Sequence, residues 1–225
     1  MLNKLHISKI EMHSDDWFQA RLARFTASEI YSLMGDKKPY GLPYIYRKVG
    51  EELSGLPARD EIDVEATRHG LIHETEALKA FGDTRGVEFV AVQKFIGEPD
   101  SRFSASPDGL IVHAESEDKL SYNVSPVEVK CPSNYANHVA MSLCNSPEEL
   151  KKVNKNYYWQ LIMQMYVCDS LFGYFVSYQP YFKSGGLKVI EFRKALLREE
   201  FKLMKERMDY ALGEFDRVRE ILISQ

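Results

Sequence analysis

Two short stretches carry acidic and basic side chains at a spacing that could form one site. The first is Ser-Pro-Asp-Gly at residues 106–109, and the second, one hairpin later, is Val-Glu-Val-Lys at residues 127–130. Residues two apart in a strand point to the same face, so Glu128 and Lys130 are expected on one side of their strand, beside Asp108 at the neighbouring strand end. Two carboxylates and an ammonium group would then converge.

Each stretch alone also has an ordinary structural explanation, as a turn or as the solvent face of a strand. Their convergence favours a site for a hard divalent cation such as Mg²⁺, which takes one or two carboxylate ligands and keeps several waters. The expected ligands are Asp108, Glu128 and the carbonyl of Val129. Lys130 binds no metal while protonated, but its charge can orient an attacking water and favour the hydroxide form.

A third carboxylate and a polar stripe extend the candidate site. Glu74 shares the apolar face of an expected helix with leucines three residues before it and four after it. A Glu is seldom buried without a partner or a metal, although pairing with a Lys or Arg elsewhere is the alternative. Tyr157, Gln160 and Gln164 form a similar stripe on an apolar helix. They are either satisfied core groups or groups aimed at a metal and a phosphate.

Periodicity and capping signals indicate the elements that must position these residues. Three helices are expected to begin near residues 14, 26 and 146, and five others are expected to span about 43–54, 64–81, 133–143, 156–168 and 197–222. The helix that begins near residue 26 starts with a capping box formed by Thr26 and Glu29. Strands are expected at residues 89–96, 103–106, 110–113, 124–130, 171–178 and 188–192, the first three or four of them antiparallel. The pattern predicts a single α/β domain over residues 1–225.

Composition narrows the class of protein. The chain has 225 residues, of which 44% are hydrophobic and 28% charged, which excludes a disordered chain or a coiled coil. The net charge of −4 excludes a globally basic coat for nucleic acid, and residues 60–130 carry fifteen acidic against seven basic side chains. Neither a signal peptide nor a membrane span is indicated, so we expect a soluble cytoplasmic protein.

The three cysteines, Cys131, Cys144 and Cys168, show no Cys-x-x-Cys spacing. An odd number without this spacing argues against a disulfide framework, a structural zinc or an iron–sulfur cluster, and indicates a reducing compartment. His69 and His73 near Glu74 suggest a zinc site, but solvated or core histidines are the better interpretation without a third helical ligand.

The motifs resemble the lambda-type phage exonucleases of the PD-(D/E)XK nuclease superfamily, also described as viral recombinases. The resemblance rests on Asp-Asp-Trp-Phe-Gln-Ala-Arg-Leu at residues 15–22, Phe-Thr-Ala-Ser-Glu at 25–29, the Pro-Asp turn, Glu-Val-Lys-Cys-Pro at 128–132 and Tyr-Tyr-Trp-Gln-Leu at 157–161. The Pro-Asp and Glu-x-Lys pattern is degenerate alone, and the N-terminal block makes it specific.

The resemblance implies a restriction-endonuclease-like fold, with a central mixed sheet of about five strands flanked by helices. It divides the chain into an N-terminal helical region (1–60) with a DNA-end pocket, a catalytic core (61–192) and a C-terminal helix (193–225). It implies a Mg²⁺-dependent exonuclease that degrades one strand of linear duplex DNA from the 5′ end to mononucleotides and leaves 3′ tails. A homotrimeric ring and a single-strand annealing protein of a phage or prophage recombination system in a bacterial host are the implied partners.

The resemblance also implies catalytic roles for particular residues. Asp108 and Glu128 match the metal-binding carboxylates, Lys130 the catalytic lysine, Glu74 the helix carboxylate near a second metal, and Tyr157 and Gln160 the helix beside the site. In a two-metal scheme the cations lie about 3.5–4 Å apart and clamp the attacking and leaving oxygens. Mn²⁺ is the alternative ion.

Arg21 and Ser28 match the family's pocket for a terminal 5′-phosphate, and a guanidinium fork suits phosphate oxygens. Lys37 and Lys38 compete for a third, basic position in that pocket. Trp17 either stacks on a base or anchors its helix in the core. The residue that separates the terminal base pair is expected among three candidates, namely Thr67, His69 and Leu71.

Two other functions fit part of the pattern. A restriction or junction-resolving endonuclease of the same superfamily would keep the metal site but would have no use for an end pocket at Arg21 and Ser28. A non-catalytic module that binds DNA ends or a partner would use Asp108, Glu128 and Lys130 only as a salt bridge.

Overall fold

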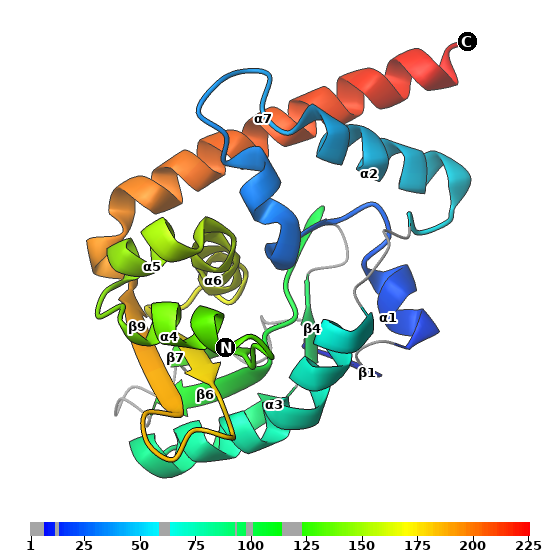
Figure 1. The fold of residues 1–225 in the computed structure, drawn as a ribbon. Coiled ribbons are helices and arrows are strands. Elements are labelled where there is room, and N and C mark those ends of the chain that lie inside the picture. The colour runs from blue at the N-terminus through cyan, green and yellow to red at the C-terminus, as the bar shows by residue number, and fades with distance from the viewer. Residues whose placement is uncertain (1–6, 12–13, 59–63, 93, 98–100, 114–122) are drawn as a thin grey trace.

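A computed structural model describes the chain except for residues 1–6, 12–13, 59–63, 93, 98–100 and 114–122 (Figure 1). The helices are α1 (Asp15–Ala20), α2 (Leu42–Ser54), α3 (Val64–Arg85), α4 (Tyr135–Ser142), α5 (Pro147–Val153), α6 (Lys155–Val167) and α7 (Arg198–Ile223), with 3₁₀ helices η1 (Ala27–Leu33) and η2 (Lys194–Leu196). The strands are β1 (Ile7–Glu11), β2 (Phe25–Thr26), β3 (Phe89–Val92), β4 (Lys94–Ile96), β5 (Phe103–Ser104), β6 (Gly109–His113), β7 (Asn123–Lys130), β8 (Phe172–Tyr178) and β9 (Leu187–Arg193). In the described part of the chain, no helix is both long and apolar enough to cross a bilayer.

A five-stranded mixed sheet forms the centre of the fold, in the order β3-β6-β7-β8-β9. Only the β7–β8 pair is parallel, and the other three pairs are antiparallel. The prediction of an α/β fold with a mixed sheet of about five strands flanked by helices is therefore confirmed (Figure 1).

The two faces of β7 contact different helices. Val127 and Val129 pack in a cluster with Leu78 and Phe81 of α3, whereas Phe175 of β8 belongs to a second cluster with α6. Because side chains alternate along a strand, Glu128 and Lys130 face the α6 side. The sheet therefore carries the candidate acid and lysine under α6 while its other face is anchored by α3.

Two expected strands have different partners from those predicted. The segment expected as one strand at 89–96 is divided between β3, in the central sheet, and β4, which pairs with β1, an element that the sequence did not reveal. The strand expected at 103–106 is the two-residue β5, which pairs in parallel with β2. The prediction of consecutive antiparallel strands holds at Ala105, which forms an antiparallel bridge with Ile96, whereas β5 itself pairs in parallel with a segment about eighty residues away.

The helix expected after Thr26 is a 3₁₀ helix. Thr26 does occupy the N-cap position, but its hydroxyl lies 3.4 Å from the Glu29 carboxylate and forms no hydrogen bond with a backbone amide at the helix start. Ala27, Ile30 and Leu33 are all buried. Their three-residue spacing fits a 3₁₀ helix, in which positions i and i+3 line up on one side.

The C-terminal helix α7 follows the predicted apolar stripe through most of its length. Met204, Met208 and Phe215 are at most 2% exposed and pack in the cluster that also contains residues of η1, α2 and α6. Leu222, the last residue of the predicted stripe, is 47% exposed. α7 and α2 diverge toward the C-terminus (Figure 1), and the stripe is buried only where other elements pack against it.

Replacing Phe215 by Ala should lower the free energy of unfolding by about 3–5 kcal/mol, because the ring is fully buried against Phe25 and below the guanidinium of Arg102. Chemical denaturation followed by circular dichroism measures this change. Ile223→Ala, at a side chain that is 65% exposed, is the control and should change stability by less than about 0.5 kcal/mol. Equal effects of the two substitutions would contradict this description of α7.

Candidate active site

A cleft of about 500 Å³ opens beside the ends of β6 and β7. The cleft brings together residues that are far apart in the sequence: Trp17, Arg21, Ser28, Glu74, Asp108, Glu128, Val129, Lys130, Tyr157 and Gln160. All of these were candidate site residues in the sequence. The expected convergence of two carboxylates and a lysine is therefore found, and Glu74 lines the same cleft.

The carboxylate of Glu128 is the most enclosed acid of the cleft, at 1% exposed. The amide nitrogen of Gln160 donates to Oε1 at 2.6 Å, and the amide nitrogen of Gln164 donates to Oε2. Lys130 also donates to Oε1. The polar stripe on α6 thus binds Glu128 through its two amides, which fixes the direction of this carboxylate.

Tyr157, the third member of the stripe, has a different contact. Its ring stacks on Phe175 at 5.7 Å, and the ammonium of Lys130 lies 5.1 Å from the centre of the ring. Lys130 therefore makes a cation–π contact with the Tyr157 ring. Lys130 remains 26% exposed and can reach the open cleft.

Asp108 lies at the start of β6 and is fixed by the neighbouring strand. The backbone amide of Val129 donates to its Oδ2 at 2.6 Å. Burial, and then the charges of Glu128 and Glu74, raise the pKa of Asp108 well above its usual value, although Lys130 acts in the opposite direction. The Lys130 charge therefore does not neutralise the three acids.

Lys130 is itself held in its charged form. Burial alone would lower its pKa, but the nearby charges of Glu128 and Asp108 outweigh burial and raise the pKa above the usual value. The cleft thus combines an ammonium with an excess of carboxylates. Several buried carboxylates with only one ammonium between them are costly to bury without a further counter-ion.

The donor set fits a hard divalent cation. Asp108, Glu128 and Glu74 supply carboxylate oxygens, and the carbonyl of Val129 lies in the same cleft. Burial and the neighbouring acids disfavour the ionised form of Asp108 and so raise its pKa, and a bound cation would offset both effects. Among the residues that the structure describes, no three His, Cys, Asp or Glu side chains come close enough to hold a metal by themselves. A cation such as Mg²⁺ that keeps several waters suits so open a set of ligands.

The cleft is also lined by Arg21 and Ser28. The Arg21 guanidinium lies 4.0 Å from the centre of the Trp17 ring and donates to the Ser28 hydroxyl at 3.3 Å. Trp17 is 7% exposed, and its indole NH donates to the Ser106 hydroxyl at 3.2 Å. Trp17 therefore anchors α1 to the turn that precedes Asp108, in addition to lining the cleft.

Sequence analysis did not identify several cleft residues. Ser106 lies two residues before Asp108, in the motif already noted, and this spacing was the available signal. Ser133, Asn134 and Asn137 line the cleft just after the Glu-Val-Lys strand. Asn134 caps α4 by accepting a hydrogen bond from the backbone amide of Ala136 at 2.8 Å.

Lys37 and Lys38 do not line the cleft. Both are exposed, and the ammonium of Lys38 lies 5.7 Å from the ring of Tyr210 on α7. Neither lysine therefore supplies the third basic ligand that was expected in the phosphate pocket. The third basic ligand was expected just after η1, but the chain in that region packs against α7, where Tyr40 and Lys38 contact Tyr210.

The three candidates for strand separation lie on α3, but the side chains of Thr67 and Leu71 lie outside those described. His69 Nδ1 lies 3.0 Å from the carbonyl oxygen of Cys131, and its ring is 4.7 Å from that of His73. His73 contacts Glu76. Both histidines thus have hydrogen-bond partners within the protein.

Comparisons with known proteins identify the family. The YqaJ-like viral recombinase domain matches residues 16–170. Two solved structures of an alkaline exonuclease from Laribacter hongkongensis, one of them in complex with dAMP, share 22% identity and cover 94% of this chain and 99% of theirs, with TM-scores of 0.68 and 0.67. A phage-related exonuclease from Haemophilus somnus 129PT shares 15% identity over 88% of this chain and 96% of its own, with a TM-score of 0.65.

No curated protein matches this sequence. The solved structures show that the fold is shared, and the family match extends over every candidate residue of the cleft. The resemblance inferred from the sequence motifs is thereby confirmed, and the chain belongs to the YqaJ-like viral recombinase domain family.

Proposed function

We propose that this protein is a Mg²⁺-dependent 5′→3′ exonuclease, which degrades one strand of linear duplex DNA to mononucleotides and leaves 3′ single-stranded tails. The observation that carries the proposal is that one cleft contains both the acid–lysine group and the Arg21–Ser28 pair. The names of the structural relatives support it, since they are exonucleases and one was solved with the mononucleotide dAMP.

The acids and Lys130 would act on the scissile phosphodiester. Asp108, Glu128, Glu74 and the carbonyl of Val129 are the groups that would hold Mg²⁺, as one or two ions, with Mn²⁺ as an alternative. When bound, Mg²⁺ supplies Lewis acidity toward the phosphate and lowers the pKa of water. Gln160 and Gln164 keep the Glu128 carboxylate in place, so that it need not reorganise when substrate binds.

Lys130 would orient the attacking water and stabilise negative charge that develops on the phosphate oxygens. In this proposal Lys130 acts in its ammonium form, so its role is electrostatic, without abstraction of a proton. The ring of Tyr157 limits its movement. Because the Lys130 side chain is 26% exposed, its ammonium can contact a substrate bound in the cleft.

Arg21 and Ser28 would bind the terminal 5′-phosphate. The guanidinium offers several donors of which one is used on Ser28, and the serine hydroxyl can turn toward the ligand. An end phosphate bound there would place an internal phosphodiester at the acids, which explains dependence on a DNA end. We also propose that the Ser106 hydroxyl contributes to the phosphate pocket, since it lines the cleft and accepts a hydrogen bond from the Trp17 indole.

A homotrimeric ring around the duplex would reconcile a net charge of −4 with DNA binding, because each subunit then needs only a small basic surface. The 3′ tails would pass to a single-strand annealing protein of a phage recombination system. The protein would act in the cytoplasm of the bacterial host.

Linear duplexes with a 5′-phosphate should be degraded faster than those with a 5′-hydroxyl, and only when Mg²⁺ is present. The end pocket and the metal site both predict this pattern, and release of mononucleotides from a labelled 5′ end measures it. A covalently closed circular plasmid is the control and should remain intact. Cleavage of the circle would support the endonuclease alternative, and absence of any Mg²⁺-dependent cleavage would contradict the proposal.

Replacing Lys130 by Met should reduce turnover at least about a hundredfold, because the charge that stabilises the developing negative charge is lost. Binding of linear duplex should remain within a few-fold of wild type, as measured by fluorescence anisotropy. Lys79→Met, at a side chain that is 77% exposed on α3, is the matched control and should retain activity. Unchanged turnover in Lys130→Met would exclude a catalytic role for this lysine.

Mg²⁺ should raise the melting temperature of the wild-type protein, since a ligand that binds only the folded state stabilises it by about 2.7 kcal/mol at a hundredfold excess over its Kd. Asp108→Asn should lose most of this response while keeping the stability of the metal-free protein, because one crowded negative charge is removed. Asp83→Asn, at an exposed acid on α3, should respond as wild type does. A full Mg²⁺ response in Asp108→Asn would show that this acid is not a ligand.

A further inference from the structure

A second cavity, of about 230 Å³, lies next to the cleft and shares Trp17 and Arg21 with it. Its walls also include Glu29 of η1 and three charged residues of α2, namely Arg47, Lys48 and Glu51. The Arg21 guanidinium therefore has carboxylates on one side and the candidate phosphate pocket on the other. This arrangement raises the question of what keeps Arg21 available to a phosphate.

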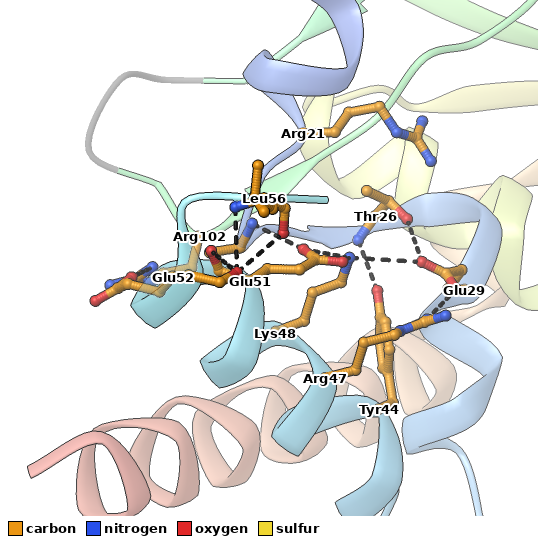
Figure 2. Close-up of polar contacts among 12 residues, drawn as sticks. Arg21, Thr26, Glu29, Tyr44, Arg47, Lys48, Glu51, Glu52, Leu56 and Arg102 are labelled. Carbon is orange, nitrogen blue, oxygen red and sulfur yellow. Dashed lines mark hydrogen bonds and ion pairs between the residues drawn. The ribbon is translucent and has the colours of Figure 1, made fainter. Parts of the chain in front are cut away.

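Glu51 is neutralised by a lysine on its own helix. The ammonium of Lys48 lies 3.1 Å and 3.0 Å from the two carboxylate oxygens of Glu51, and the two residues are 5% and 4% exposed (Figure 2). Glu51 also accepts a hydrogen bond of 2.9 Å from the backbone amide of Ala23. Ala23 has a positive φ of 55°, so Glu51 stabilises a strained bend two residues after Arg21.

Glu29 is neutralised in a similar way by α2. Arg47 forms an ion pair with Glu29, and the ammonium of Lys48 lies 3.8 Å from its Oε2. The Thr26 hydroxyl is a further contact of this carboxylate. Arg47 and Lys48 thus balance the two acids of this cavity.

Arg21 is the cation that remains. In the described parts of the chain, no carboxylate lies within ion-pair distance of its guanidinium, and its contacts are the Trp17 ring and the Ser28 hydroxyl. In Figure 2 its side chain lies apart from the ion pairs of Lys48 and Arg47, and no dashed line joins it to them. Burial lowers the pKa of Arg21, although the charges of Glu29 and Glu51 are close enough to raise it. Both acids are therefore potential partners that are already occupied.

We propose that Lys48 is a positioning residue for the end pocket: by pairing with Glu51 it keeps this acid from binding Arg21, and so determines the preference for phosphorylated DNA ends. The inference rests on the proposed function in so far as Arg21 binds the terminal phosphate. A buried carboxylate that lacks its counter-ion is strongly disfavoured, so it will recruit a nearby cation. Arg21 lines the same cavity, which has room for the guanidinium.

The experiment measures binding of short duplexes with either a 5′-phosphate or a 5′-hydroxyl, by fluorescence anisotropy in EDTA, where no cleavage occurs. Wild type should bind the phosphorylated end about tenfold or more tightly, as expected for a hydrogen bond to a charged group. In Lys48→Met this ratio should fall to within about twofold of one. In the double variant Lys48→Met with Glu51→Gln, Glu51 can no longer recruit Arg21 and Glu29 keeps its ion pair with Arg47, so the ratio should recover.

The ratio is taken within one protein sample, so loss of folded protein alone does not change it. Glu52→Gln is the matched control, since Glu52 lies on the same helix and pairs with Arg102 and Arg219 outside this cavity. It should keep the wild-type ratio.

A wild-type ratio in Lys48→Met, or failure of the double variant to recover, would overturn the inference. Equal binding of both ends by wild type would overturn it as well, because Arg21 would then bind no end phosphate. The nuclease proposal is separate, since it depends on Mg²⁺-dependent cleavage of linear DNA.

Discussion

The site depends on a buried carboxylate whose direction is fixed before any ligand arrives. Glu128 lies on a central strand, is almost fully enclosed, and is bound by two glutamine amides and an ammonium. Removing a carboxylate of this kind from water is costly, and the cost is tolerated only because each oxygen has a donor. Gln160 and Gln164 of α6 supply two of these donors, and a helix with only apolar side chains at that position would leave the acid without them.

The mixed sheet explains how acids from distant segments share one cleft. The antiparallel β6–β7 pair places Asp108 beside the end of β7, where the Val129 amide binds it. The parallel β7–β8 pair requires a crossover, and that crossover contains α6 with its two amides. On the opposite face α3 packs against the valines of β7 and carries Glu74 to the cleft. Each part of the topology therefore contributes a different group to the same space.

Local periodicity was sufficient to predict most of this arrangement. The grouping of Glu128 with Lys130 follows from the strand period, and the inward orientation of Glu74 follows from the helix period. The pairing of β1 with β4 and of β2 with β5 could not be predicted, because short strands carry little pattern and their partners are distant in sequence. The position of Lys37 and Lys38 was predicted from motif order alone, whereas their surroundings are set by packing against α7.

The Lys48–Glu51 pair was invisible in the sequence for another reason. Charged residues three apart on a helix usually lie on its solvated face, and nothing local distinguishes a buried pair from an exposed one. Its burial arises from the close approach of α2 to the bend at Ala23. The ion pairs of α2 and the acids Asp108 and Glu128 thus line two neighbouring cavities that share Arg21.

The hydrogen bond from the Trp17 indole to Ser106 links the segment that holds Arg21 to the segment that holds Asp108. It joins α1, which ends directly before Arg21, to the turn that leads into Asp108, and both partners line the cleft. The separation between the guanidinium and the acids is consequently a property of the protein scaffold and does not vary with the base sequence of a bound strand. Under the proposed function, a separation fixed in this way gives products of the same length from any DNA.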